Sequence, residues 1–368
     1  MPELSNQERE TQRMLMRWLR DLGIPAHTLP GSTGVVGTLA GRAPGGAVGL
    51  RADMDALPVL EETGATFRSR NHLMHACGHD VHMAALLGAA AFLKRDESHL
   101  PCPVKLLFQP AEEEGHRGGA GPMIEAGVLT SAPRVRRVFG LHLRSTLPLG
   151  TYAFLPGVAM AAADRVAVRV LGRGGHAAYP HLSVDPIVMA SEMVLSLQTL
   201  ISRSRDPLDP AVLSICRIDG GTKDNILPDE VRLEGTVRTV DPATRRRLRQ
   251  LLRTRLRGIA RASGGSVEIE YDFGYPVLRN DPGVTGALED AFREEMGRSR
   301  IVHLTRPWMG AEDFARFLAR VPGTFLFVGT GDGGAGSAPL HSARFLPSDR
   351  ALLAAAAAHV LAVRTLGA

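Results

Sequence analysis

The chain has 368 residues, of which 43 are Lys or Arg and 38 are Asp or Glu, giving a formal net charge of +5. This length predicts two domains, and the 44% apolar and 22% charged residues exclude a mainly disordered protein. The three cysteines, Cys77, Cys102 and Cys216, form no C-x-x-C pair, which excludes a disulfide scaffold and favours a cytoplasmic location. The polar N-terminal segment shows no signal peptide. The longest apolar run, 351–363, is too short for a membrane span.

Hydrophobic periodicity predicts an α/β architecture for the first part of the chain. Apolar residues at helical spacing indicate a helix over 8–22. Short strands at 34–39 and 46–51, a buried helix at 80–94 and strands at 104–108 and 137–142 are predicted to follow. This order is typical of a doubly wound sheet, in which ligands bind beyond the carboxyl ends of the strands.

The pattern changes near Asp164, where a β-α-β-β-α-β order typical of a ferredoxin-like α+β unit begins. The predicted elements are a strand at 165–171, a helix at 186–201, strands at 211–218 and 230–239, a helix at 242–262 and a strand at 266–271. From residue 277 the first pattern returns, with a helix at 285–297 and a strand at 324–328. We therefore predict a domain of residues 1–163 and 277–368 with a mixed doubly wound sheet. A second domain, 164–276, is predicted to be inserted into it.

Five segments of the first domain carry side chains that can bind metal ions. Their donors are Asp53 with Asp55, Cys77 with His79, Glu112 with Glu113 and Glu114, His142, and His341. A borderline ion such as zinc accepts sulfur, nitrogen and oxygen ligands together. Two ions about 3.5–4 Å apart would need a bridging ligand and about this many donors. Each group has an ordinary structural explanation by itself, such as a solvated glutamate run or a core histidine. Together, at strand ends and glycine-rich loops, they favour a dinuclear metal hydrolase.

Seven segments spread through nearly the whole chain resemble one known family, in the same order. They are Leu50–Pro58 (LRADMDALP), Met74–Asp80 (MHACGHD), Phe108–Glu113 (FQPAEE), Gly172–His181 (GRGGHAAYPH), Asn225–Pro228 (NILP), Gly235–Arg238 (GTVR) and Met309–Phe314 (MGAEDF). They are similar to segments of the aminoacylase and carboxypeptidase family of dinuclear metallohydrolases. Within that family the chain most resembles the branch of N-acyl-amino-acid amidohydrolases, hippurate hydrolases and plant auxin-conjugate hydrolases.

The resemblance implies a metal centre and its catalytic groups. The implied ligands of two divalent ions are Cys77, as the bridge, with His79, Glu113, His142 and His341. Zinc or manganese is expected, and cobalt and nickel also suit such a mixed site. Glu112 is the implied general base, which takes the proton of the attacking water and delivers it to the leaving amine. Asp55 is expected to orient a metal ligand, and Asp53 at the same strand end is the alternative.

The resemblance also implies that the inserted domain acts as a lid and dimerisation domain, so that the protein is a homodimer or a higher homo-oligomer. His176 would reach a neighbouring active site and help to hold the oxyanion, although it could also be an ordinary loop histidine. Asn225 and Arg238 would bind the substrate's carboxylate, for which a guanidinium fork is well suited. Ala343 and Arg316 stand where the branch usually has Pro and an aromatic residue, which leaves the shape of the acyl pocket open.

The implied function is metal-dependent hydrolysis of the amide bond of an N-acyl amino acid, with the acyl group undetermined. The alternative is an aminopeptidase or dipeptidase of the same clan, which would need a polar group for a free substrate ammonium. Binding of nucleic acid through the arginine-rich segment 245–257 is disfavoured, because no aromatic residues interleave there. Its apolar residues, Leu248, Leu251, Leu252 and Leu256, with Ile259 beyond it, form the stripe of a packed amphipathic helix.

Overall fold

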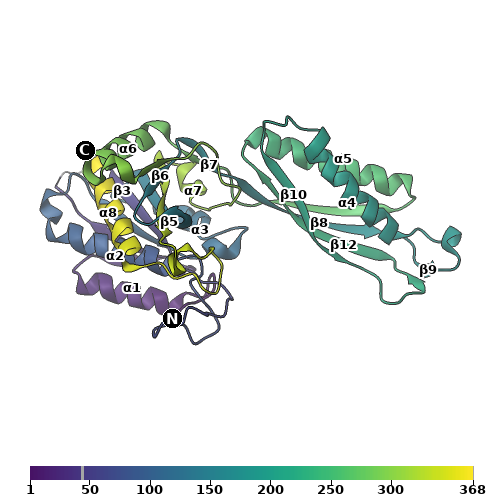
Figure 1. Ribbon diagram of the computed structural model, residues 1–368, viewed down its shortest axis with the longest axis horizontal. Coiled ribbons are helices and arrows are strands. Elements are labelled where there is room, and N and C mark those ends of the chain that lie inside the picture. Colours follow the sequence, from purple (N-terminus) through teal and green to yellow (C-terminus); the bar gives the residue numbers. More distant parts are fainter. Residues whose placement is uncertain (43–44, 368) are drawn as a thin grey trace. The chain divides into compact units, whose positions relative to one another are not determined.

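The structure is a computed structural model that describes residues 1–42 and 45–367. Residue 368, the end of the predicted first domain, lies outside the described residues. Contacts within the chain divide it into two compact units (Figure 1). Unit 1 comprises Met1–Ala159, Leu278–Pro307 and Glu312–Ala368, and unit 2 comprises Met160–Val277 and Trp308–Ala311. None of the helices in the described ranges is long and apolar enough to cross a membrane.

Unit 1 is built on an eight-stranded mixed sheet, which confirms the predicted α/β fold class. The strand order is β1-β2-β4-β3-β5-β16-β6-β15. The bounds are β1 Ala26–Thr28, β2 Val35–Leu39, β3 Ala47–Asp53, β4 Val104–Gln109, β5 Val135–Pro148, β6 Tyr152–Phe154, β15 Ile301–His303 and β16 Gly323–Gly331. The central strands β4, β3, β5 and β16 run parallel, whereas β2 and β6 are antiparallel to their inner neighbours. The parallel centre brings the carboxyl ends of β3, β4 and β5 to one edge of the sheet.

Four helices pack on this sheet around one hydrophobic cluster. They are α1 Arg9–Asp21, α2 His79–Arg95, α6 Pro282–Met296 and α8 Asp349–Leu366. Helix α1 buries Leu15 and Leu19, which are one turn apart, so its apolar stripe faces the core as its periodicity predicts. Helix α8 contacts α2 through a run of alanines, and these small side chains let the two backbones approach closely.

Several strands are longer than the sequence predicts, and two of them carry residues of the candidate site. Strand β3 continues two residues past Arg51 because Ala52 and Asp53 pair with Phe108 and Gln109 of β4. Strand β5 continues past His142 to Pro148 because its second half pairs with β16. Cross-strand pairing, which periodicity does not show, therefore decides where these strands end.

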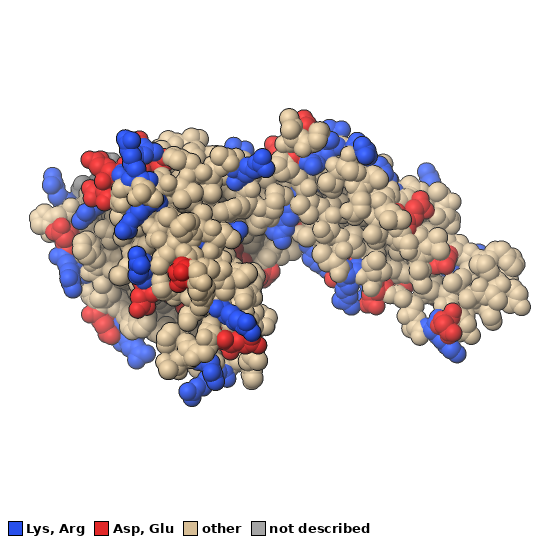
Figure 2. All heavy atoms as spheres, viewed as in Figure 1, with Lys and Arg blue, Asp and Glu red and all other residues tan. Residues whose placement is uncertain are grey.

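Unit 2 has a four-stranded antiparallel sheet in the order β10-β12-β8-β13. Its elements are β8 Ala162–Leu171, α4 Pro186–Arg203, β10 Ala211–Asp219, β12 Glu230–Thr239, α5 Pro242–Ala262 and β13 Ser266–Phe273. A two-stranded sheet joins β9 Gly175–His176 to β11 Ile226–Leu227. Leu248, Leu252 and Leu256 of α5 are buried in the core of this unit, as their spacing predicts. On the face shown in Figure 2, basic and acidic side chains are interspersed over each unit.

Candidate metal centre

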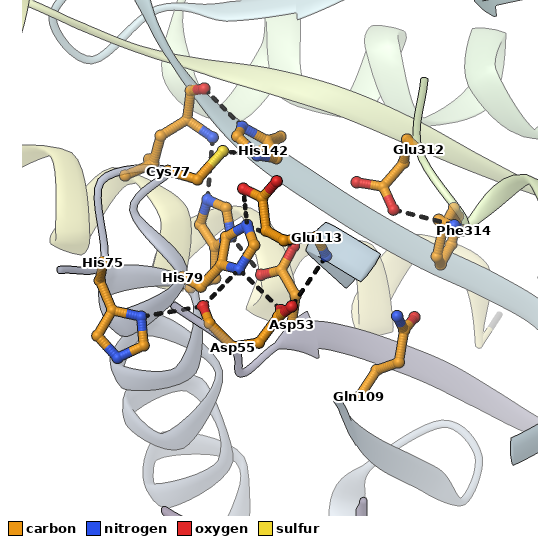
Figure 3. Close-up of polar contacts among 12 residues, drawn as sticks. Asp53, Asp55, His75, Cys77, His79, Gln109, Glu113, His142, Glu312 and Phe314 are labelled. Carbon is orange, nitrogen blue, oxygen red and sulfur yellow. Dashed lines mark hydrogen bonds and ion pairs between the residues drawn. The ribbon is translucent and has the colours of Figure 1, made fainter. Parts of the chain in front are cut away.

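The sheet edge and the loops beside it bring the predicted metal donors of unit 1 together (Figure 3). Asp53 ends β3, His79 begins α2, and Glu112 lies in a single helical turn, Glu112–Glu114, just after β4. His142 lies within β5, and His341 lies in the loop after β16. The order of the strands therefore gathers distant residues, such as Cys77 and His341, which contact each other although they lie 264 positions apart in the sequence.

Cys77 lies between two of the histidines. Its Sγ is 3.3 Å from His142 Nε2 and 3.3 Å from His341 Nε2. His341 Nε2 is also 3.2 Å from Glu113 Oε1. Burial raises the pKa of the Cys77 thiol, so a thiolate at this position needs a nearby cation, which a bound metal ion would supply. One sulfur with nitrogen atoms close on two sides has the contacts expected of a bridging ligand.

His79 is oriented by Asp55. Its Nδ1 is 3.0 Å from the Asp55 carbonyl oxygen and 3.3 Å from Asp55 Oδ1, so an Nδ1–H would donate to Asp55. Its Nε2 makes no hydrogen bond among the described residues and lies 4.0 Å from Glu113 Oε1. A metal-binding histidine commonly presents one nitrogen to the ion and donates the other N–H to an oxygen. His79 and Asp55 have this arrangement.

Asp53 has different partners. It accepts a hydrogen bond from His82 Nδ1 at 2.6 Å and another from Arg51 Nη1 at 2.7 Å, and it lies 3.4 Å from His79 Nε2. Burial by itself would lower the pKa of His79, but Asp53, Asp55 and Cys77 raise it well above its ordinary value. The surroundings of His79 thus favour positive charge.

His82 was assigned no role in the sequence analysis, although it lies one helical turn after His79. Its Nε2 accepts a hydrogen bond from the Leu143 N–H at 3.0 Å, which ties α2 to β5 beside His142. The i, i+3 spacing of two histidines at a helix start was the signal that could have identified it.

Glu112 is 7% exposed and lies among other carboxyl groups. Burial first, and then Glu312, Glu113 and Asp313, raise the pKa of Glu112 well above its ordinary value. Oxygen atoms of Glu112, Glu312 and Asp313 lie within 4.8 Å of one another. The adjacent Glu114 is exposed and accepts backbone hydrogen bonds within its own loop, so it is not part of this group.

A buried arginine joins this carboxylate group to the sheet. Arg51 donates to Gln109 Oε1 at 2.9 Å, to Glu312 Oε1 at 2.8 Å and to Asp313 Oδ1 at 3.1 Å, in addition to Asp53. Burial raises the pKa of Glu312 to about 8, although Arg51 opposes the shift. All of these residues belong to segments that carry the family resemblance, but nothing in their spacing indicates that they meet.

The remaining predicted residues, His176, Asn225 and Arg238, belong to unit 2. His176 is exposed on β9, and its Nδ1 accepts the Ala178 N–H at 3.1 Å, which places the ring proton on Nε2. Asn225 is also exposed. It lies close to His176, because its backbone carbonyl oxygen accepts the Ala177 N–H at 3.2 Å. Arg238 lies apart from this pair, half-buried on β12 between Val212 and Ala163. Burial lowers its pKa from the ordinary value.

Comparison with known proteins identifies the family. Residues 49–365 match the family described as Peptidase family M20/M25/M40. The chain is 40% identical over 364 residues to thermostable carboxypeptidase 1 of Saccharolobus solfataricus, which covers 98% of this chain and 91% of the relative. It is 43% identical over 284 residues to the N-acyl-L-amino acid amidohydrolase of Geobacillus stearothermophilus, covering 77% and 76% of the two chains.

A solved structure extends the match to three dimensions. The YXEP protein of Bacillus subtilis, described as a dinuclear metal binding peptidase from M20 family, superimposes with a TM-score of 0.85 at 33% identity. The alignment covers 100% of this chain and 94% of that one. The resemblance inferred from the seven sequence segments is therefore confirmed, and the chain belongs to the M20/M25/M40 peptidase family.

Proposed function

We propose that the protein is a metal-dependent amidohydrolase that cleaves the amide bond of N-acyl amino acids. The observation that carries this proposal is the convergence of Cys77, His79, Glu113, His142 and His341 beside the buried Glu112. This arrangement occurs in a chain that is 43% identical to a relative named N-acyl-L-amino acid amidohydrolase. Membership of the family supports hydrolysis of amide bonds, and the names of the relatives support N-acyl amino acids as the class of substrate.

The donor set suits two divalent ions held by Cys77 with His79, Glu113, His142 and His341. Sulfur, imidazole nitrogen and carboxylate oxygen together fit zinc, manganese, cobalt or nickel, and we favour zinc or manganese. His79 Nε2, which makes no hydrogen bond among the described residues, is the atom that a metal would satisfy. When bound, such ions polarise the amide carbonyl and lower the pKa of water.

Glu112 performs the proton transfers in this proposal. Its carboxylate takes a proton from the attacking water while the water oxygen bonds to the amide carbon. The same proton then passes to the leaving nitrogen as the carbon–nitrogen bond breaks. Burial and neighbouring carboxyl groups raise the pKa of Glu112, which makes it a stronger base for this step than an exposed glutamate. Asp55 keeps His79 in the tautomer that leaves Nε2 available.

Unit 2 has three roles in the proposal. His176 carries its ring proton on Nε2 and donates a hydrogen bond from it to the oxyanion in a neighbouring active site, as the family resemblance implies. Asn225 and Arg238 bind the carboxylate of the substrate. The unit also mediates association with a second copy as a homodimer, which is supported by the edge position of β10 and by exposed apolar side chains on α4, namely Ile187, Val188 and Leu195.

In this proposal residues 1–163 and 277–368 form the catalytic domain, and residues 164–276 form the inserted lid and dimerisation domain. We also propose a cytoplasmic location, which is supported by the three cysteines, all of them free in the structure.

A hydrolysis panel on metal-reconstituted protein tests the function. N-acetyl, N-benzoyl and N-indoleacetyl amino acids are incubated with the protein, and the released amino groups are quantified with and without EDTA. We expect EDTA-sensitive release from at least one series and none from Glu112→Ala. Glu114→Ala is the matched control, because Glu114 is an exposed neighbour outside the carboxyl group cluster. No hydrolysis of any N-acyl substrate by metal-loaded protein would refute the proposal.

The alternative of an aminopeptidase or dipeptidase is tested in the same panel with unblocked dipeptides. A relative named carboxypeptidase is compatible with the proposal, because a carboxypeptidase also releases an amino acid with a free carboxylate. Faster turnover of unblocked dipeptides than of their N-acetyl forms would favour the alternative.

A further inference from the structure

We propose that Glu8 is a positioning residue that holds Glu112 in place through the backbone of Ala111, so that a residue just before α1 helps to organise the active site. The inference rests on the proposed role of Glu112 as the general base. None of the seven segments that carry the family resemblance includes Glu8.

Glu8 is completely buried, and both of its carboxylate oxygens have partners from distant parts of the chain. Oε1 accepts the backbone N–H of Ala111 at 2.9 Å, and Oε2 accepts the hydroxyl of Thr33 at 2.5 Å. Ala111 immediately precedes Glu112 and is itself fully buried. Glu8 therefore holds the backbone one residue before Glu112, the proposed general base.

The carboxylate of Glu8 is free to bind Ala111 because it does not cap the helix that Glu8 precedes. It is the N-cap residue of α1, yet its side chain makes no capping hydrogen bond. The free N–H groups of the first turn are bonded instead by Glu3, which accepts from Thr11 N at 2.8 Å and from Glu10 N at 3.1 Å. The carboxylate of Glu8 is thus not needed to start α1.

The backbone of Ala111 needs such a support. It has φ 56° and ψ 37°, in the left-handed region that is unfavourable for a residue with a Cβ atom. The loop is also confined on its other side, because a Cβ added to Gly119 would lie 1.9 Å from the Pro110 carbonyl oxygen. Without Glu8, the buried Ala111 N–H would lose its acceptor, and the backbone would relax and displace Glu112.

The same N-terminal segment supports the other side of Glu112. Ser5 Oγ donates to Asp55 Oδ2 at 2.7 Å, and this oxygen also accepts the Glu113 N–H at 2.8 Å. The segment is anchored to the strand end by the Ala56 N–H, which donates to the Glu3 carbonyl at 2.8 Å. The residues before and after Glu112 are therefore held by Glu8 and by the pair of Ser5 and Asp55.

Substitution of Glu8 tests the inference. We expect Glu8→Ala to lower kcat on an N-acyl amino acid about 100-fold, because a general base displaced by about 1 Å loses roughly that factor. KM and metal content should stay near the wild-type values. Glu8→Gln should retain most of the activity, because its amide oxygen can still accept the Ala111 N–H. If the alanine variant does not fold, Glu8→Asp replaces it. The shorter side chain moves the carboxylate away from the Ala111 N–H, so the same loss of kcat is expected.

Two further measurements separate positioning from general stability. Glu3→Ala is the matched control, because it removes the α1 cap from the same segment without touching Ala111; it should lower Tm but leave kcat unchanged. Adding Ala111→Gly to Glu8→Ala should restore part of kcat, because glycine adopts the left-handed conformation without strain. Hydrogen exchange of peptide 106–116, followed by mass spectrometry, should accelerate in Glu8→Ala and not in Glu3→Ala.

Each outcome has a defined meaning. A wild-type kcat in Glu8→Ala, or an equal loss of kcat in Glu3→Ala, would overturn the positioning role, as would unchanged hydrogen exchange. If metal-loaded wild-type protein hydrolyses no N-acyl amino acid, the proposed function fails, whereas the exchange measurement still decides whether Glu8 holds the Ala111 backbone.

Discussion

The buried arginine of unit 1 allows a quantitative prediction about stability. Arg51 is 1% exposed, and its guanidinium contacts three carboxyl groups, those of Asp53, Glu312 and Asp313. Arg51→Met would leave these groups buried without the guanidinium that they share. Asp53 should be affected most, because Arg51 is the strongest of the charges that hold the pKa of this buried carboxyl well below its ordinary value.

The expected cost follows from breaking one buried ion pair together with its hydrogen bonds. Removal of one partner of such a pair costs about 3–5 kcal/mol, so we expect Arg51→Met to lower the free energy of unfolding by about 4 kcal/mol. At about 2–4 °C for each kcal/mol in a domain of this size class, Tm should fall by roughly 10 °C. Arg51→Lys keeps the charge but loses the planar fork, and about half of the cost should remain.

Urea unfolding of metal-free protein in EDTA measures this effect separately from any change in metal binding. Arg13→Met is the control, because Arg13 pairs with Glu10 of α1 at the surface of unit 1, where both side chains are more than half exposed. It should change the free energy of unfolding by less than about 1 kcal/mol. A change of that small size in Arg51→Met would refute the reasoning, because the network would then contribute no more than a surface pair.

Three further predictions concern the metal centre and unit 2. Glu112→Ala should reduce kcat by about 10²–10⁴-fold or more while metal content measured by mass spectrometry stays near wild type; loss of both metals with failure to refold would indicate a structural role instead. Cys77→Ser should lower metal occupancy after dialysis against the free ion, because a hydroxyl is a poorer ligand than a thiolate, and unchanged occupancy would remove Cys77 from the ligand set. His176→Ala should lower kcat far more than Tm, since His176 is exposed on β9; an unaffected kcat would exclude a catalytic role for unit 2.

The elements of the fold were largely predictable because they follow from local patterns. The apolar stripe of α5, with Leu248, Leu252 and Leu256, is buried as its spacing indicates. The alternating residues Val166, Val168 and Val170 of β8 likewise face the core of unit 2. Helix and strand periodicity depends on residues within one or two turns, and such neighbours are visible in the sequence. The sequence analysis predicted ends for β3 and β5 that lie too early in the chain, because the true ends depend on pairing with β4 and β16.

The sequence allowed the candidate metal donors to be proposed from their residue types, but it did not show which side chains contact each other. The sequence left Asp53 and Asp55 as alternatives because both follow the same strand. In the structure Asp55 contacts His79 Nδ1, whereas Asp53 is bound to His82 and Arg51. The two aspartates are two positions apart in the sequence, and only the placement of α2 against the strand end decides which of them meets Nδ1 of His79 and which lies near Nε2.

The sequence by itself predicted the type of the main helices and strands, proposed the candidate metal donors and, through its seven segments, indicated the family. Only the tertiary structure decided which distant residues meet. It places His341 against Cys77, Glu312 against Arg51 and Glu8 against Ala111, pairs separated by 264, 261 and 103 residues. The physical reason is that such contacts depend on strand order and helix packing across the whole sheet. No local pattern in the chain records that Glu8, the N-cap residue of α1, contacts the loop that carries Glu112.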